Sequence, residues 1–347
     1  LGMLLPVAPG VTPGSGPAHL GLFGYDPSEY VVGRGALSAL GVGFDLRPGD
    51  VAVRLNLATL DEEGRILDRR AGRPSDEVGR KVVERLRESI SLGDDVELFL
   101  QHEKEHRVVL VLRGPDLAAA IADTDPQETG VPPLDPEPLD EASERTASLM
   151  REFLTRARDA LRREGPVTGL LARGFARYDG FPSFEERFGL EALAFARYPM
   201  YRGVARLVGM EIPGEPKTDA EAVDMLAEHF DRADFHFIHF KAPDARGEDR
   251  NFGAKVQAIE AIDALVPRLV ELNPEVIAVT GDHSTPAGMG THSWHHVPLL
   301  LASSRSRPTG TSFSERSCRG GDIGIVESRY LMSLMLAHAG RLMKFGA

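Results

Sequence analysis

The stretch "DFHFIHF" at residues 234–240, with "FGAKVQAIEAIDALVPRLVEL" at 252–272 and "EVIAVT" at 275–280, decides the fold class. The outer two segments are short apolar runs typical of buried strands, whereas the middle one places apolar residues at helical spacing. Pro267 is expected to kink that helix or end it early. A further apolar run, "HVPLLLA" at 296–302, reads as another strand. Strand, helix and strand in this order favour a right-handed crossover, so we predict an α/β fold with a mostly parallel sheet covered by helices.

Ligand-type side chains gather directly after the strand at 275–280. The loop "TGDHSTPAGMGTHSW" contains Asp282, His283 and His292. Loops that follow the strands of a parallel sheet leave from its carboxyl edge, where ligands bind. Carboxylates and imidazoles are donors for a hard-to-borderline divalent metal. The loop is therefore a candidate metal site, with an ordinary polar turn as the alternative.

The loop after the strand at 234–240 offers two more carboxylates. "KAPDARGEDRNF" contains Asp244 and Glu248, and it leaves the same predicted sheet edge. Oxygen donors from a second loop strengthen the prediction of a metal site. The alternative is that both carboxylates cap the helix that begins near Asn251, where the positive end of the helix dipole favours them.

Ser15 lies in the sequence "PGSGP", which forces a tight turn and leaves the serine hydroxyl uncrowded before an apolar helical stretch. Two interpretations are open: a nucleophile at a helix N-terminus, or a simple N-cap residue. Spacing alone favours the cap. The surrounding residues do not form a G-x-S-x-G nucleophile elbow, so a serine-hydrolase triad has little support.

The region between the two ends of the chain has a different pattern of apolar and polar residues. Residues 51–57 alternate apolar and polar side chains, and residues 96–114 read as two strands joined by a charged turn. Strands without intervening helices indicate a mainly antiparallel α+β region with one face in water. We predict a discontinuous core domain at 1–44 and 166–347, with a smaller α+β domain inserted at 45–165.

Bulk composition excludes several classes of protein. With 52 Asp and Glu against 40 Lys and Arg, the formal net charge of -12 argues against a nucleic-acid or anionic-membrane binder, although it permits a local basic pocket. The one cysteine, Cys318, forms no intramolecular disulfide, which fits a reducing compartment. No apolar stretch approaches the ~20 residues of a membrane span. We expect a soluble cytoplasmic protein, and its oligomeric state is open.

Several long motifs, in order, resemble those of one enzyme family. The chain is similar over nearly its whole length to the archaeal-type cofactor-independent phosphoglycerate mutases of the alkaline phosphatase superfamily. The resemblance implies an alkaline-phosphatase-like α/β core with an inserted α+β domain. It also implies an isomerase of glycolysis and gluconeogenesis that interconverts 3-phosphoglycerate and 2-phosphoglycerate through a phosphoserine, without 2,3-bisphosphoglycerate. The motifs are "PGSGPAHLGLFGYDPSEYVVGRGALSALG" at 13–41, "DRRAGR" at 68–73, "HRVVLVLRG" at 106–114, "DTDP" at 123–126, "TGDHSTP" at 280–286, "HSW" at 292–294 and "HVPLLL" at 296–301.

The resemblance makes Ser15 the phosphorylated nucleophile, against the cap interpretation. It also implies two divalent metal ions, manganese or magnesium, with cobalt or zinc as alternatives. Asp282 and His283 would share one ion with the Ser15 oxygen. Binding to a cation lowers the pKa of the serine hydroxyl, so that it can attack a phosphate at neutral pH.

The resemblance assigns the other ion to Asp244, His292 and the residue four positions after Asp244. That position is often histidine in the family, and here it is Glu248. The substitution departs from the family pattern but still supplies an oxygen donor. Whether Glu248 would bind directly or through water is open.

Substrate-binding side chains are implied on the inserted domain, which would act as a lid that excludes water. Bidentate arginines suit the carboxylate and phosphate of phosphoglycerate, and Asp123 would orient or deprotonate a glycerate hydroxyl. For each candidate the alternative is a solvated surface charge. The substrate-binding candidates are Arg34, Arg69, Arg70, Arg73, His106 and Arg107.

The largest departure from the family pattern is at the N-terminal end of the sequence. Family members begin with a strand that ends in a D-G-x-G-D-type segment, whose aspartate is a metal ligand, and nothing in this sequence matches it. We expect the first few dozen residues to be missing from this sequence. Two alternatives stay open: a phosphatase or other phosphoryl-transfer enzyme of the same superfamily, and a non-catalytic binding protein with the same fold.

Overall fold

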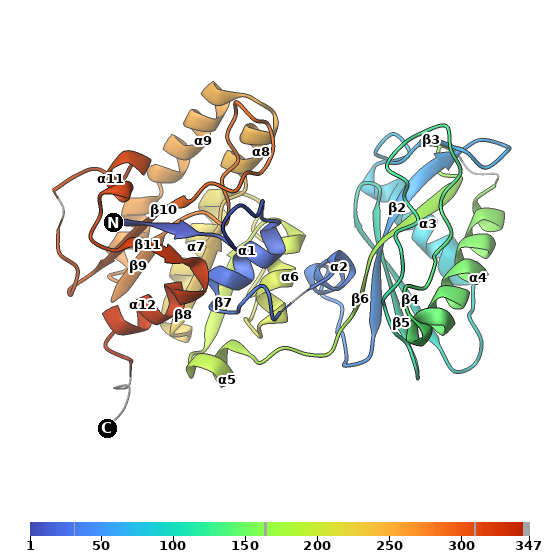
Figure 1. The fold of residues 1–347 in the computed structure, drawn as a ribbon, viewed down its shortest axis with the longest axis horizontal. Coiled ribbons are helices and arrows are strands. Elements are labelled where there is room, and N and C mark those ends of the chain that lie inside the picture. The colour runs from blue at the N-terminus through green and yellow to red at the C-terminus, as the bar shows by residue number, and fades with distance from the viewer. Residues whose placement is uncertain (31, 163–164, 309, 343–347) are drawn as a thin grey trace. The chain divides into compact units, whose positions relative to one another are not determined.

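The computed structural model describes residues 1–30, 32–162, 165–308 and 310–342 (Figure 1). The chain divides into two compact units. The first unit comprises Leu1–Val31, Phe184–Val204 and Gly209–Ala347, and the second comprises Val32–Ser183 and Ala205–Val208. The inserted domain expected at 45–165 lies within the second unit, and its boundaries stay a prediction.

The first unit contains sheets of mixed direction. A four-stranded sheet has the order β11 (Gly324–Glu327), β1 (Gly2–Leu5), β10 (Val297–Ser303) and β9 (Val276–Val279). Strand β1 runs parallel to β11 and antiparallel to β10, and β10 runs antiparallel to β9. A separate pair, β7 (Ala192–Ala196) and β8 (Phe235–His239), is parallel.

The prediction of a mostly parallel sheet is therefore corrected to mixed sheets within an α/β fold. The three strands expected from apolar runs are present, but the loop after β9 returns the chain antiparallel as β10. An apolar run locates a strand without fixing its direction. Strand β1 was missed because its four residues are flanked by a proline and carry no alternation.

Helices surround these sheets along the first unit (Figure 1). Helix α10 has Pro267 in its first turn, so the expected early end of the preceding helix is confirmed. None of the helices in the described ranges is long and apolar enough to cross a membrane. The helices are α1 (Ser15–Leu22), α5 (Phe184–Phe188), α6 (Pro199–Leu207), α7 (Asp219–Glu228), α8 (Ala242–Glu248), α9 (Phe252–Asp263), α10 (Val266–Glu271), α11 (Glu315–Arg319) and α12 (Leu331–His338).

The second unit is built on an antiparallel sheet, as the sequence predicted. Its order is β3 (Ile66–Asp68), β2 (Val51–Leu60), β5 (Arg107–Arg113) and β4 (Glu97–Lys104), and β6 (Gly169–Arg177) also pairs with β2. Each of these pairings is antiparallel. The expected hairpin at 96–114 is the β4–β5 pair.

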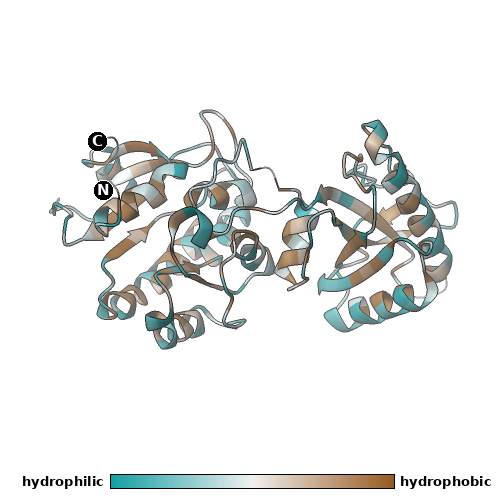
Figure 2. Ribbon diagram, turned by 90° about the horizontal axis from the view of Figure 1, so that it is seen from below, coloured by the Kyte–Doolittle hydropathy of each residue, from teal (hydrophilic) through white to brown (hydrophobic). Residues whose placement is uncertain are grey.

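Helices cover both faces of this sheet. Val53, Leu55 and other alternate residues of β2 are fully buried in a core shared with α3 (Asp76–Ser89) and α4 (Glu144–Leu161). The helical ribbons carry both hydrophobic and hydrophilic residues, as expected for helices with one buried face (Figure 2).

The opposite face of β2 packs against α2 (Arg34–Gly41). A Cβ atom on Gly35 would lie 2.2 Å from the Ala52 carbonyl oxygen, so only glycine permits this approach. The expectation of one face in water is wrong for β2, because alternation shows which residues differ in polarity and not what covers them.

Candidate active site

Ser15 is the first residue of α1, and its hydroxyl does not cap the helix. The N-cap is Gly14, which makes no side-chain cap hydrogen bond. Ser15 is only 8% exposed, and its Oγ lies 3.0 Å from His283 Nε2. The N-cap interpretation is therefore wrong, and the hydroxyl faces the loop after β9.

His283 lies between Ser15 and the carboxylates of both predicted loops. Its Nε2 is 3.2 Å from Asp282 Oδ2, and its Nδ1 is 3.1 Å from Thr285 Oγ1. The Thr285 hydroxyl donates in turn to Asp244 Oδ1. With its hydrogen on Nδ1, His283 donates to Thr285 and accepts from Ser15. Burial lowers the pKa of His283, although the two aspartates oppose it, so the imidazole is neutral and able to act as a ligand.

One group of possible metal ligands consists of Asp244, His283 and His292. One donor atom from each lies within 4.8 Å of the others. His292 Nε2 is 3.6 Å from Asp244 Oδ1, and its Nδ1 is 3.0 Å from the Pro13 carbonyl oxygen. The two imidazole rings stack with centroids 3.6 Å apart. The sequence predicted all three residues, and the structure brings them together.

Asp244 is held in its charged form. Burial would raise the pKa of this carboxyl, but hydrogen bonds from Lys241 and Thr285 and the charge of Lys241 outweigh it and lower the pKa. An ionised carboxylate is the form that binds a cation.

Glu248 lies one helical turn after Asp244 on α8. Its Oε1 is 3.7 Å from His292 Nε2, and its side chain is half exposed. Helix α9 is capped by Asn251, whose Oδ1 accepts from the Ala254 amide. The helix-cap alternative for Asp244 and Glu248 is therefore wrong.

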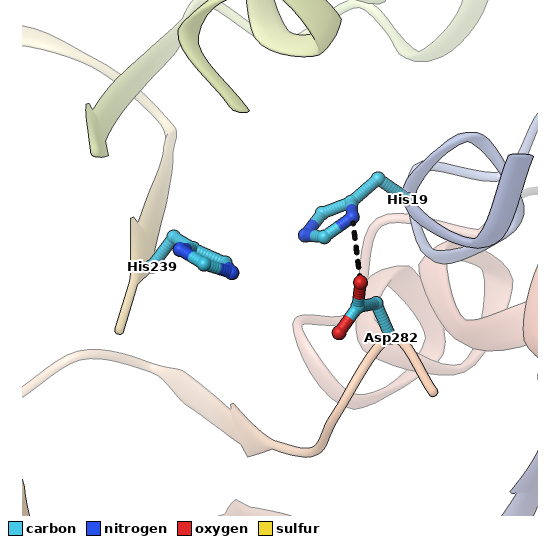
Figure 3. A group of neighbouring side chains, drawn as sticks. All are labelled: His19, His239 and Asp282. Atoms are coloured by element: carbon cyan, nitrogen blue, oxygen red, sulfur yellow. Dashed lines mark ion pairs between the residues drawn. The ribbon is translucent and has the colours of Figure 1, made fainter. Parts of the chain in front are cut away.

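A second group of possible ligands, His19, His239 and Asp282, was only partly predicted (Figure 3). His19 Nδ1 lies 3.3 Å from Asp282 Oδ2 and 2.7 Å from the Ser15 carbonyl oxygen. Burial lowers the pKa of His239 well below its usual value, so this ring is also neutral. Asp282 Oδ2 is buried and has no hydrogen-bond partner among the described residues.

Sequence reasoning missed His19 and His239, although signals for both existed. His19 follows Ser15 by four residues, which places both on one face of a helix. His239 is the last residue of β8, at the carboxyl end of its strand.

Tyr201 and Lys241 lie beside the two groups of possible ligands and were also missed. The Tyr201 ring stacks on the His239 ring, and Lys241 Nζ, which donates to Asp244, lies 5.8 Å from the centre of the Tyr201 ring. Burial raises the pKa of Tyr201 to about 12, and the charge of Asp282 adds to the effect. The phenol is therefore a hydrogen-bond donor at neutral pH.

In the second unit, arginines surround His106. His106 is 4% exposed, and burial lowers its pKa to about 4, with further lowering by four neighbouring positive charges. Three of these were predicted substrate-binding residues and the fourth was not. They are Arg107, Arg70, Arg73 and Arg54, in that order of effect.

Arg54 connects this group to another predicted residue. Burial lowers the pKa of Arg54; Glu103 opposes the effect, while Arg34, Arg107 and Arg173 add to it. Arg54 was missed because it stands among the apolar residues of β2, where its spacing suggested a solvent-facing side chain. We use the name arginine cluster for Arg34, Arg54, Arg70, Arg73, Arg107 and Arg173.

Arg69 and Asp123 have partners within the same unit. Arg69 forms two hydrogen bonds, of 2.7 and 2.8 Å, to the buried Asp125 carboxylate. Asp123 Oδ1 accepts from the Gly174 amide at 2.7 Å, and its Oδ2 is 3.5 Å from Arg173 Nε. Arg69 is thus engaged by a protein carboxylate.

Known proteins resemble this chain along its length. The family model of 2,3-bisphosphoglycerate-independent phosphoglycerate mutase matches residues 1–166. A relative from Thermus thermophilus, named "Probable 2,3-bisphosphoglycerate-independent phosphoglycerate mutase", is 52% identical over 100% of this chain and 86% of its own length. A relative from Thermotoga maritima with the same name is 45% identical over the same shares.

Solved structures agree. A protein from Pyrococcus horikoshii matches with a TM-score of 0.83 and 29% identity, covering 100% of this chain and 88% of that one. The cofactor-independent phosphoglycerate mutase from Thermoplasma acidophilum matches with a TM-score of 0.71 and 30% identity, covering 98% of this chain and 88% of that one. The chain belongs to the archaeal-type family of 2,3-bisphosphoglycerate-independent phosphoglycerate mutases, which are isomerases of glycolysis.

Proposed function

We propose that this chain converts 3-phosphoglycerate to 2-phosphoglycerate through a phosphoserine on Ser15, at a site for two divalent metal ions. The observation that carries the proposal is the position of Ser15 Oγ. This buried hydroxyl makes no cap and lies 3.0 Å from His283 Nε2, beside both groups of possible ligands.

The residues present fit divalent cations. Asp282 Oδ2 is a buried carboxylate oxygen without a hydrogen-bond partner in the described structure, which a cation would satisfy. Burial keeps His239 and His283 neutral, as ligands must be. The absence of thiolates from both groups suits manganese or magnesium, with cobalt or zinc as alternatives.

We assign Ser15, Asp282 and His283 to one ion, and Asp244, Glu248 and His292 to the other. His283 touches both sets, and His19 and His239 offer further donors beside Asp282. Bound cations would lower the pKa of a nearby hydroxyl and neutralise the oxygens of a transferring phosphoryl group.

The chain's own residues then carry the transfer. Ser15 Oγ loses its proton and forms a bond to phosphorus while the bond from phosphorus to the 3-oxygen of glycerate breaks, and that oxygen gains a proton. The retained glycerate next presents its 2-hydroxyl, which loses a proton as its oxygen bonds to phosphorus, while the bond from phosphorus to Ser15 Oγ breaks and Ser15 Oγ regains a proton. We give Asp123 the role of orienting or deprotonating that hydroxyl.

The arginine cluster supports binding of a substrate with two anionic groups, a carboxylate and a phosphate, by a protein with a formal net charge of -12. Guanidinium groups recognise carboxylate and phosphate with paired hydrogen bonds. We propose that Arg34, Arg70, Arg73 and Arg107, together with His106, contact phosphoglycerate. Arg69 is bound to Asp125, which also pairs with Arg173 of the cluster.

Replacing the nucleophile tests this function. Ser15→Ala should lower formation of 2-phosphoglycerate by more than about a hundredfold, because no group remains to accept the phosphoryl group. A matched control is Ser328→Ala, which removes another buried hydroxyl, one that bonds to the Pro6 carbonyl oxygen. The assay follows both 2-phosphoglycerate and inorganic phosphate, without 2,3-bisphosphoglycerate.

Two outcomes would contradict the proposal. Ser15→Ala with the activity of the wild type would remove Ser15 from its role. A wild-type protein that releases inorganic phosphate in place of 2-phosphoglycerate would be a phosphatase of the same superfamily.

A further inference from the structure

Strand β2 carries two polar side chains on the face that points away from the core of the second unit. Arg54 and Asn56 alternate with the core residues of the strand, so both lie on the opposite face. Asn56 is 5% exposed, and its Oδ1 has no hydrogen-bond partner in the described residues. The buried Nε of Arg54 has none there either. An acceptor and a donor without partners thus lie two residues apart on one strand.

The neighbouring strands add positive charge to this face. Arg173 of β6 is directly opposite Arg54, and Arg107 of β5 is directly opposite Asn56. Residues directly opposite each other in an antiparallel pair share a face, and like charges in such pairs destabilise a sheet. Three arginines on one face of this sheet therefore favour an anionic ligand there.

Protein carboxylates engage Arg173 but leave Arg54 Nε without a partner. Arg173 Nη1 is 3.2 Å from Asp125 Oδ2, and its Nε is 3.5 Å from Asp123 Oδ2. Burial lowers the pKa of Arg54, and the charge of Glu103 opposes this effect. The buried Oε2 of Glu103 also lacks a hydrogen-bond partner in the described structure, so it does not bond to Arg54 Nε. Buried polar atoms without partners cost folding free energy, which is typical of functional sites.

The two unpartnered atoms differ in what they require of a ligand. A guanidinium can only donate, and an amide oxygen can only accept. A phosphate or a simple carboxylate would satisfy Arg54 and leave Asn56 Oδ1 without a donor. An α-hydroxy carboxylate satisfies both, because its carboxylate accepts while the hydroxyl on the next carbon donates. The carboxyl end of 3-phosphoglycerate has this structure.

We propose that Arg54 and Asn56 form the subsite for the α-hydroxy-carboxylate end of 3-phosphoglycerate: the Arg54 guanidinium donates to the carboxylate, and Asn56 Oδ1 accepts from the 2-hydroxyl. The inference rests on the proposed function and adds two residues that the sequence did not predict. It agrees with the place of Asp123, to which we give a later role at the same hydroxyl. Asp123 pairs with Arg173, the residue opposite Arg54.

Calorimetric titration of two ligands tests this subsite. The ligands are 3-phosphoglycerate and 3-phosphooxypropanoate, which is the same molecule without its 2-hydroxyl. Both are titrated into Ser15→Ala with Mn²⁺ present, so that the proposed nucleophile is absent and the heat reports binding alone. This protein should bind 3-phosphoglycerate at least about tenfold more tightly, because the other ligand leaves Asn56 Oδ1 buried and unpaired.

Replacing Asn56 in the same background should remove that difference. Asn56→Leu keeps the branched shape of the side chain without polar atoms, and Asn56→Ala removes the polar atoms without adding bulk. Each should bind the two ligands with affinities within about twofold of each other, because a single hydrogen bond accounts for the preference. Affinity for 3-phosphooxypropanoate should stay within about twofold of the Ser15→Ala value, whereas loss of a structural residue would weaken both ligands.

Arg54→Met should weaken both ligands at least about tenfold, because both carry the carboxylate. The matched control is Arg145→Met, which removes an arginine of the same unit that donates to Asp95 at 2.6 Å. It should bind both ligands as Ser15→Ala does.

Three outcomes would contradict these proposals. Equal affinities of Ser15→Ala for the two ligands, with a wild type that forms 2-phosphoglycerate, would overturn this inference alone. An equal loss of affinity for both ligands in Asn56→Leu and Asn56→Ala would do the same. A wild type that forms no 2-phosphoglycerate would overturn the proposed function and the inference with it.

Discussion

His283 has contacts on both ring nitrogens, and this determines how the two groups of possible ligands relate. Its Nε2 faces Ser15 and Asp282, while its Nδ1 faces Thr285 and, at 3.9 Å, Asp244. A ring that bonds through Nε2 and donates from Nδ1 has a fixed tautomer and orientation. Changes at either proposed metal position should therefore alter the surroundings of Ser15, the proposed nucleophile.

At Glu248 the chain has a carboxylate where the family resemblance led us to expect an imidazole. An oxygen donor suits harder cations, so Glu248→His should shift the activity of the metal-stripped enzyme from added manganese or magnesium toward cobalt or zinc. Calorimetric titration of each ion should show the same change in relative affinity. The basis is the 3.7 Å between Glu248 Oε1 and His292 Nε2.

Two variants control this experiment. Glu248→Gln keeps an oxygen donor without the charge and should weaken binding of every ion. Asp249→His places an imidazole at the next position, where the native carboxylate pairs with Arg246, and should leave the metal profile of the wild type. Identical profiles for wild type and Glu248→His would show that Glu248 is not a ligand.

His106 should make stability depend on pH. Its pKa is lowered from 6.5 to about 4, by burial first and then by neighbouring arginines, so the unfolded chain takes up a proton that the folded chain refuses. The free energy of unfolding is then largest above pH 6.5 and falls as the pH drops toward 4, with a contribution on the order of 2 kcal/mol.

Urea unfolding of wild type and His106→Gln across this range measures the contribution by difference, because other groups that titrate are common to both proteins. The His106→Gln variant should lose less stability on acidification than wild type. Parallel stability curves for the two proteins would show that His106 titrates normally.

Site residues could be predicted from the sequence where a side chain that can bind a metal follows a predicted strand. Asp244, Asp282, His283 and His292 are donor residues on loops that follow strands, and the structure brings them together. Tyr201 could not be predicted in this way. A tyrosine in an amphipathic helix has the pattern of a core residue, and only the folded structure shows its ring stacked on His239.

Among the elements, α2 and β2 approach each other more closely than ordinary side chains allow. The variant Gly35→Ala tests this contact, because the added Cβ would lie 2.2 Å from the Ala52 carbonyl oxygen. Separating the helix from the strand should cost about 1–3 kcal/mol of unfolding free energy. Thermal unfolding followed by circular dichroism would measure it as a lower Tm.

Gly253→Ala is the matched control in α9. Its Cβ would meet only Asn251 Oδ1, at 3.9 Å, so the higher helix propensity of alanine should raise stability by up to about 1 kcal/mol. Opposite signs for the two variants support the close contact. A Gly35→Ala protein as stable as wild type would show that α2 is not held against β2.

The positions of strands and helices could be predicted more fully than their pairing. Apolar runs located β8, β9 and β10, and Pro267 ended its helix as expected. The antiparallel return from β9 to β10 could not be predicted, because direction is set by tertiary contacts that leave no period in the sequence. For the same reason, the packing of α2 against β2 could not be predicted from the sequence.

At the scale of the whole molecule, the two compact units contain different chemistry. The first unit contains Ser15 and both groups of possible metal ligands found in the described residues, and the second contains the arginine cluster. The proposed function requires both kinds of chemistry, since it includes transfer of a phosphoryl group and retention of glycerate. A phosphoserine on Ser15, in the first unit, is the intermediate that we propose.

The most direct test is to look for that phosphoserine. Enzyme supplied with manganese and mixed with 3-phosphoglycerate would be quenched in acid within a single turnover, digested, and examined by mass spectrometry. The account predicts phosphate on the peptide that contains Ser15, formed as fast as 2-phosphoglycerate appears, and none on that peptide in Ser15→Ala. Phosphate found on a different residue, or 2-phosphoglycerate formed before any phosphate is found on Ser15, would contradict the proposed mechanism.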